Sequence, residues 1–123
     1  MAHNFSEYFT EDKPIIVNFH GYPQTMKQVL FDYGCDSDRV SIHGYEEVGS
    51  TTTAFDMMVR NHVDRYHLAM QAFAFAEKTG VIDEDTLLRL TSLLQEKLDK
   101  HYEYIMDNGD DPIEITNWVW HSR

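Results

Sequence analysis

Two short apolar runs with a helical segment between them stand near the start of the chain. The run at 14–20 is rich in β-branched residues and ends in a His-Gly-Tyr sequence, and the run at 39–45 ends in a second one. Between them, apolar residues recur at helical spacing from Thr25 until Gly34 ends the pattern. Strand, helix and strand within 32 residues predict a βαβ unit with parallel strands.

The pattern becomes helical after the run Gly49-Ser50-Thr51-Thr52-Thr53. Thr53 and Asp56 have the spacing of a helix-capping pair, and a helix is expected to begin there, with a short buried strand at 55–60 as the alternative. The polar stretch 61–64 predicts a break, and a second helix should run over 65–78 and close at Gly80. Six residues are expected on one helical face: Phe55, Val59, His62, Tyr66, Met70 and Phe73.

A long amphipathic helix is predicted from Asp83, its N-cap, to Asn108-Gly109. Glu96 and Lys100 are four residues apart on it, a spacing that favours an ion pair. The apolar segment 113–120 after Pro112 is expected to be a last strand or a docked extended segment, because two exposed tryptophans would be costly in water. The fold class predicted is α/β, a small mostly parallel sheet flanked by helices.

Composition narrows the class of protein. A chain of 123 residues with 42% hydrophobic content fits one compact unit, and its net charge of −11 opposes binding to nucleic acid or anionic membranes. Cys35 is the only cysteine, which excludes an intrachain disulfide and suits a reducing cytoplasmic setting. We expect no classical export signal, because residues 1–9 have no basic or apolar leader, and no run of about 18 apolar residues predicts a membrane span.

The two His-Gly-Tyr turns are the first candidate site. Ligands of open α/β sheets bind beyond the carboxyl ends of parallel strands, where these turns would lie. The alternative is structural: each glycine permits a sharp strand exit, and the histidine and tyrosine bond nearby loops or meet a neighbouring domain. The candidate interface or channel-mouth residues are His20, Tyr22, His43 and Tyr45.

Thr51, Thr52 and Thr53 complete the candidate list, because hydroxyls and free N–H groups at a helix start can hold an anion. A helix cap is the favoured interpretation, since no P-loop pattern is present. Metal binding is disfavoured because His62 and His67, five apart, should lie on different helical faces. Cys35 lies among aspartates that oppose thiolate formation, so we assign no catalytic, cofactor-binding or metal-ligating residue.

Several stretches together resemble the C-terminal domain of the phosphoketolase family. They are the segments 12–23, 43–53, 55–59 and 64–68 and, near the end, 108–114 and 118–120. The resemblance spans about residues 8–120, nearly the whole chain. Ala54, where the family tends to carry proline, and Ser50, where threonine is common, depart from the pattern. We expect 1–123 to be one such domain, with residues 1–9 as a lead-in or a remnant of an expressed fragment.

The resemblance implies a thiamine-diphosphate- and magnesium-dependent aldehyde-lyase of carbohydrate metabolism. Such an enzyme converts xylulose 5-phosphate or fructose 6-phosphate, with phosphate, into acetyl phosphate and an aldose phosphate. This chain would be its transketolase-like C-terminal unit, a three-layer sandwich that supports the N-terminal and middle thiamine-binding domains, in a homo-oligomer, and is inactive alone. In keeping with this, Gly109-Asp110-Asp111 lacks the third glycine of the family's cofactor motif.

Two alternatives remain open on the residues alone. One is a free-standing regulatory module that binds an anion at the His-Gly-Tyr strand ends. The other is a non-catalytic partner of a separate catalytic chain. A fragment, a separate gene product and a truncated reading frame would all give this sequence.

Overall fold

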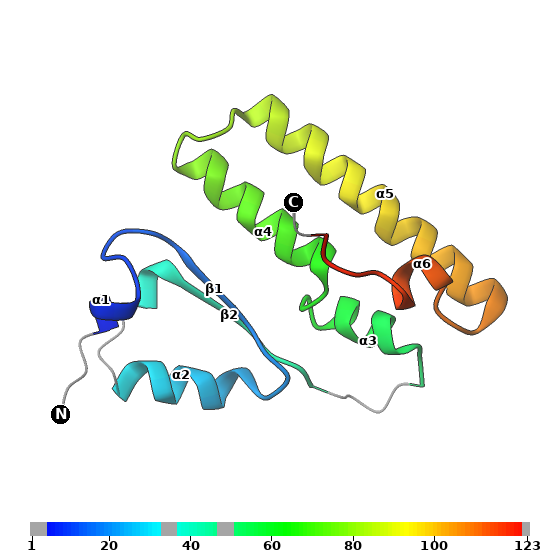
Figure 1. Ribbon diagram of the computed structural model, residues 1–123, viewed down its shortest axis with the longest axis horizontal. Helices are drawn as coiled ribbons and strands as arrows, with labels where there is room; N and C mark the ends of the chain where they lie inside the picture. The colour runs from blue at the N-terminus through cyan, green and yellow to red at the C-terminus, as the bar shows by residue number, and fades with distance from the viewer. Residues whose placement is uncertain (1–4, 33–36, 47–50, 122–123) are drawn as a thin grey trace.

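The computed structural model describes residues 5–32, 37–46 and 51–121. It contains one small sheet with helices packed beside it (Figure 1). The βαβ unit comes first in the chain, and two long helices follow it. The elements in order are α1 (Phe5–Tyr8), β1 (Ile15–Asn18), α2 (Pro23–Asp32), a 3₁₀ turn (Ser37–Arg39), β2 (Val40–His43), α3 (Ala54–Arg60), α4 (Arg65–Lys78), α5 (Glu84–Asn108) and α6 (Ile113–Thr116).

The predicted βαβ unit is confirmed. β1 and β2 are parallel, with Ile15 opposite Val40 and Asn18 opposite His43. α2 packs on β2 and α4 packs on β1, and Figure 1 shows these helices on opposite sides of the sheet. The α/β class, a small parallel sheet flanked by helices, is therefore confirmed.

The break between α3 and α4 falls where the polar stretch predicts it. The Thr53 hydroxyl caps α3 by accepting the Asp56 N–H at 3.2 Å, so the alternative of a strand at 55–60 is wrong. Asp64 caps α4 with a carboxylate that accepts the N–H groups of its first turn. Between the helices His62 has a φ of 57°, a left-handed backbone conformation. The continuous face expected from Phe55 to Phe73 is therefore wrong, because the turn ends one helix and reorients the next.

α5 runs as predicted from its N-cap Asp83 to Gly109, whose φ of 71° ends the helix in a left-handed cap. It packs beside α4 as a helical hairpin, drawn green to orange in Figure 1. The expected Glu96–Lys100 ion pair is present at 2.8 Å, although both side chains are exposed. The described residues that α5 buries are Leu98, His101 and Ile105.

The C-terminal segment differs from the prediction of a last strand or a docked extended segment. Residues Ile113–Thr116 form the short helix α6, because Pro112 stands at its N-cap and its carbonyl accepts the N–H groups of Ile115 and Thr116. Within the described residues neither tryptophan is buried. Trp120 is 80% exposed. Trp118 is 48% exposed, although the Arg65 guanidinium lies 4.8 Å from its ring centroid.

A buried carboxylate joins the end of α5 to the start of α3. Asp111 contacts the His101 ring nitrogen Nε2 at 2.8 Å and accepts the Phe55 N–H at 3.0 Å. Burial by itself raises the pKa of Asp111, but hydrogen bonds from the Thr53 hydroxyl, the His101 ring and the Phe55 N–H lower it overall. The Phe55 ring packs edge-on against His101, so the polar contact lies directly beside the buried apolar core.

We predict that Asp111→Ala lowers the free energy of unfolding by about 2–4 kcal/mol, because it strands the buried donors of Phe55 and His101. Because the pKa of Asp111 is lowered in the folded state, its contribution exists above its unfolded pKa and disappears as pH falls through the folded one. Urea unfolding at neutral and acidic pH measures both effects. The control is Asp110→Ala, an exposed neighbour; equal losses in the two variants would contradict the role of Asp111.

Candidate functional site

The segments that follow β1 and β2 lie side by side, and backbone hydrogen bonds join them. The Tyr45 N–H donates to the Gly21 carbonyl at 2.8 Å, and the Phe19 N–H donates to the His43 carbonyl at 3.2 Å. The His20 ring stacks on the Tyr45 ring with centroids 4.5 Å apart. Tyr22 stays 65% exposed. The structure therefore brings together His20 and Tyr45 of the four candidates and leaves the Tyr22 side chain largely in solvent.

Gly44 is the residue that permits this closure. A Cβ built at Gly44 would lie 2.3 Å from the Gly21 carbonyl oxygen and 2.4 Å from Cδ of Pro23. Real Cβ atoms do not approach a backbone oxygen so closely, and neither neighbour is a flexible side-chain end. This steric requirement for glycine at position 44 supports the structural interpretation of the second His-Gly-Tyr turn.

His43 belongs to a different group of side chains. Its Nε2 lies 2.9 Å from the Ser41 hydroxyl. Its pKa is lowered, first by burial and then by the nearness of His62 and His67. The His62 and His67 rings stack with centroids 4.2 Å apart and planes 7° apart. The expectation that these two histidines lie on different helical faces is therefore wrong, because His62 stands in the turn before α4 and not on the helix.

Asp64 orients the histidine at the start of α4. Its carboxylate is fully buried, accepts the Tyr66 and His67 N–H groups at 3.0 and 3.1 Å, and meets Nδ1 of the His67 ring at 2.5 Å. One side chain thus caps the helix and fixes the ring of His67. The sequence did contain a signal for this arrangement, an aspartate directly before a helix with histidine three positions on.

Thr52 and Thr53 form hydrogen bonds at the N-terminus of α3. The Thr52 hydroxyl donates to the Asp56 carboxylate at 2.6 Å, and Thr53 accepts the Asp56 N–H. Asp56 also pairs with Arg60 at 2.7 Å, while Thr51 is exposed. The helix-cap interpretation is confirmed for Thr53. Gly49, Ser50, Glu47 and Cys35 lie outside the described residues.

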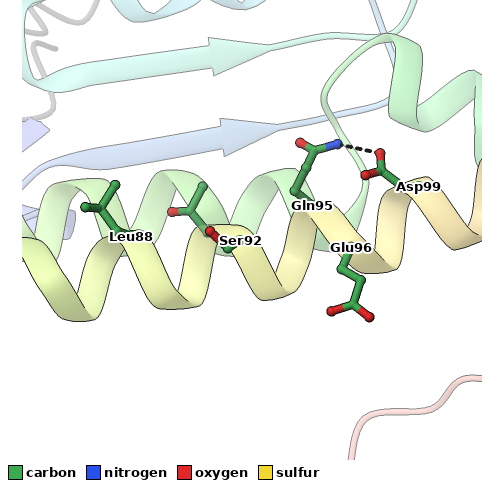
Figure 2. A pocket seen from close by; sticks show the side chains of 6 residues that line it. Leu88, Ser92, Gln95, Glu96 and Asp99 are labelled. Atoms are coloured by element: carbon green, nitrogen blue, oxygen red, sulfur yellow. Dashed lines mark hydrogen bonds between the residues drawn. The ribbon is translucent and has the colours of Figure 1, made fainter.

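One hollow lies along α5 alone. Figure 2 shows its lining on successive turns of this helix, with Gln95 donating to Asp99 at 2.9 Å. The lining residues are Leu88, Thr91, Ser92, Gln95, Glu96 and Asp99. A surface formed by one helix lacks the converging groups of a ligand site. Within 5–32, 37–46 and 51–121, no three histidine, cysteine or acidic side chains are placed to hold a metal ion.

None of the helices in the described part of the chain combines the length and the apolar character that a membrane span requires.

A two-stranded parallel sheet closed by glycine at its strand ends, with a capped helical hairpin beside it, defines a small α/β domain. The chain belongs to the family described as "XFP C-terminal domain", whose model matches residues 1–120.

Curated relatives agree with this family. The chain is 41% identical over 120 residues to "Probable phosphoketolase" of Pediococcus pentosaceus, with 94% of this chain and 14% of the relative covered. It is 38% identical to "Probable phosphoketolase 2" of Lactiplantibacillus plantarum over 94% of this chain, and 38% identical to "Probable phosphoketolase" of Gloeobacter violaceus over 95% of it. The chain spans 14% of the length of each of these relatives.

We predict that Gly44→Ala destabilises the domain by about 1–3 kcal/mol, the usual cost of forcing an atom into a packed site. Thermal unfolding followed by circular dichroism measures the loss. The matched control is Gly21→Ala, whose Cβ would meet the flexible Phe19 ring at 2.7 Å and should cost less. A Gly44 variant as stable as wild type would refute the steric role.

Proposed function

We propose that this chain acts as the single C-terminal structural domain of a phosphoketolase and that it supports the catalytic domains without being active alone. The observation that carries the proposal is the family match over residues 1–120, together with relatives of which the chain covers 14%. On this proposal the neighbouring N-terminal and middle domains of the same enzyme, and further copies in a homo-oligomer, are its partners.

The proposed full enzyme is an aldehyde-lyase of carbohydrate metabolism that works in the cytoplasm. It joins phosphate to a two-carbon unit of xylulose 5-phosphate or fructose 6-phosphate and so forms acetyl phosphate and an aldose phosphate. Thiamine diphosphate, held with magnesium in the other domains, would supply the carbanion chemistry of that cleavage. Residues of this chain would contribute packing to that assembly.

The stretch Gly109-Asp110-Asp111 does not fit the cofactor motif in its contacts either. A thiamine diphosphate site needs free oxygen ligands for its metal ion, yet the Asp111 carboxylate is buried against His101 and the Phe55 N–H. Gly109, the glycine of the same stretch, is the left-handed cap of α5. Gly109 and Asp111 of this stretch therefore have structural roles in the fold.

An exposed apolar surface at the C-terminal segment supports a docking role. Exposed large apolar residues rarely gather on a monomer without an interaction partner. Trp118 and Trp120 contact each other edge-on, with ring centroids 6.1 Å apart, and remain largely in solvent. Val119 and Ile113 in the same segment are 60% and 67% exposed. Aromatic residues of this kind are frequent anchors of interfaces.

We predict that calorimetric titration of this chain with thiamine diphosphate and magnesium gives no binding heat. The physical reason is that the Asp111 carboxylate, in the stretch that comes nearest to the cofactor motif, already has hydrogen-bond partners inside the fold. Magnesium alone and buffer alone are the controls. Saturable heat with the cofactor would contradict the non-catalytic part of the proposal.

We predict that a chimera of the Pediococcus pentosaceus relative carrying this chain in place of its matching segment forms acetyl phosphate. In that chimera Trp120→Ser should shorten the half-life of the assembly on heating by about tenfold, because losing an interface aromatic costs about 1–2 kcal/mol. Val81→Ser is the matched control, since Val81 is 76% exposed at the distant turn between α4 and α5. An inactive but folded chimera would count against the domain assignment, and equal half-lives would count against the docking surface.

The alternative of a free-standing anion-binding module at the His-Gly-Tyr strand ends stays a prediction. Titration of the chain with inorganic phosphate, followed through the signals of His20 and Tyr45, tests it directly. Saturable shifts of both rings would favour the module.

A further inference from the structure

The contact between β1 and α4, named here the β1–α4 interface, contains polar side chains. The two elements pack on each other, and Figure 1 shows α4 on the side of the sheet opposite to α2. Asn18 and His43 are register partners on adjacent parallel strands, so their side chains lie on one face of the sheet. His43 lies near His67, in the first turn of α4. The Asn18 side chain is therefore on the face of the sheet that α4 covers.

Three side-chain atoms of this interface are buried without a hydrogen-bond partner. They are Nδ2 and Oδ1 of Asn18 and Oε1 of Gln71, and no other side chain of the described residues has such an atom. Gln71 comes four residues after His67, so the two share a face of α4. Folded proteins pair the great majority of buried polar atoms, because an unpaired one costs free energy. All three atoms in one contact indicate a partner that is held there.

That partner must be small and lie inside the domain. The three atoms are covered by this chain itself, so a neighbouring domain cannot reach them without opening the interface. The polar rings beside them already have contacts of their own. Nε2 of His43 lies 2.9 Å from the Ser41 hydroxyl. Nδ1 of His67 contacts the Asp64 carboxylate. The interface therefore needs a small molecule to satisfy Asn18 and Gln71.

The chemistry of the Asn18 amide selects a neutral molecule. In either orientation of its amide group, Asn18 presents one donor and one acceptor, and both are unpaired. An anion could only accept from this amide, and a metal ion could only be bound by its oxygen. Water donates and accepts, and buried waters typically bond about three polar groups that would otherwise be unpaired. Nδ2 and Oδ1 of one amide point in different directions, so one water cannot bond both well.

We propose that the β1–α4 interface holds an internal water site, in which at least two water molecules bond the Asn18 amide and connect it to Oε1 of Gln71. Asn18 is the last residue of β1, at the edge of a parallel sheet where ligands of open α/β folds usually bind. Water occupies that edge in this domain. The βαβ unit and the helical hairpin are thus joined through water as well as through direct packing. This site belongs to the chain itself and does not depend on the proposed enzyme.

Nuclear magnetic resonance of the isotopically labelled chain tests the site directly. A long-lived internal water gives protons next to it a nuclear Overhauser effect with the sign typical of contacts within the protein, and the rotating-frame effect separates this from chemical exchange. We expect that effect between water and the Nδ2 protons of Asn18. The matched control is Asn61, whose Nδ2 donates to the Met57 and Glu46 carbonyls at 2.9 and 3.2 Å and should show none. No water contact at Asn18, or a direct contact between the Asn18 and Gln71 amides, would overturn the proposal.

The substitution Asn18→Leu gives an independent test, because a hydrated and a dry interface predict opposite signs. Leucine has nearly the shape of asparagine without its polar atoms. If water is bound, the substitution takes away its partners, and the equilibrium constant of unfolding in urea should rise about tenfold. If the amide were unpaired, its removal would relieve a penalty, and the constant would fall. A variant as stable as wild type, or more stable, would therefore contradict the water site.

A second variant and a control complete the design. Gln71→Met removes the acceptor on α4 and should also raise the unfolding constant, so the test stays open if Asn18→Leu does not fold. The double variant should lose less than the product of the two single effects, because both side chains bond the same waters. Gln95→Met on the exposed side of α5 is the control and should change the constant by less than about twofold. Independent effects in the double variant would show that no shared water connects Asn18 and Gln71.

Discussion

The contact of the Asp111 carboxylate with His101 and the Phe55 N–H is the interaction on which the helical half of the structure depends. It joins residues 56 positions apart and fixes the loop after α5 on the first turn of α3. Phe55 is among the few fully buried apolar residues of the described chain, and its ring contacts the same histidine. Without that carboxylate, the Phe55 N–H and the His101 ring nitrogen would lose the acceptor that joins them.

Three acidic side chains are buried at helix starts in this acidic chain. Asp56, Asp64 and Asp111 each lie beside the first turn of a helix, where free N–H groups and the helix dipole favour negative charge. Their burial is satisfied locally by N–H groups, hydroxyls or the Arg60 guanidinium. These carboxylates anchor the starts of α3 and α4, where few apolar side chains of the described residues are buried.

The two ends of the domain have different surfaces. At the strand ends, Gly44 and the Tyr45 N–H close the sheet tightly, and the exposed rings of His20 and Tyr22 face solvent. At the C-terminal segment, Trp118 and Trp120 are exposed with apolar neighbours. On our proposal that the chain is one domain of a larger enzyme, this second surface is the face that would meet the neighbouring domains.

The sequence by itself determined the local structure and the family. Apolar periodicity placed β1, α2, β2, α4 and α5, and the capping residues Thr53, Asp83 and Gly109 placed helix ends, because these signals act within a few residues. Only the tertiary structure decided which polar side chains meet. The His62 ring stacks on the His67 ring because His62 lies in a left-handed turn, which spacing on a helix cannot predict. The Asp111 carboxylate accepts the N–H of Phe55, a residue 56 positions away in the sequence. The sequence could not predict that Trp120 is exposed. Hydrophobicity indicates that a side chain favours burial, but it does not show whether the folded chain has a surface on which that side chain can pack.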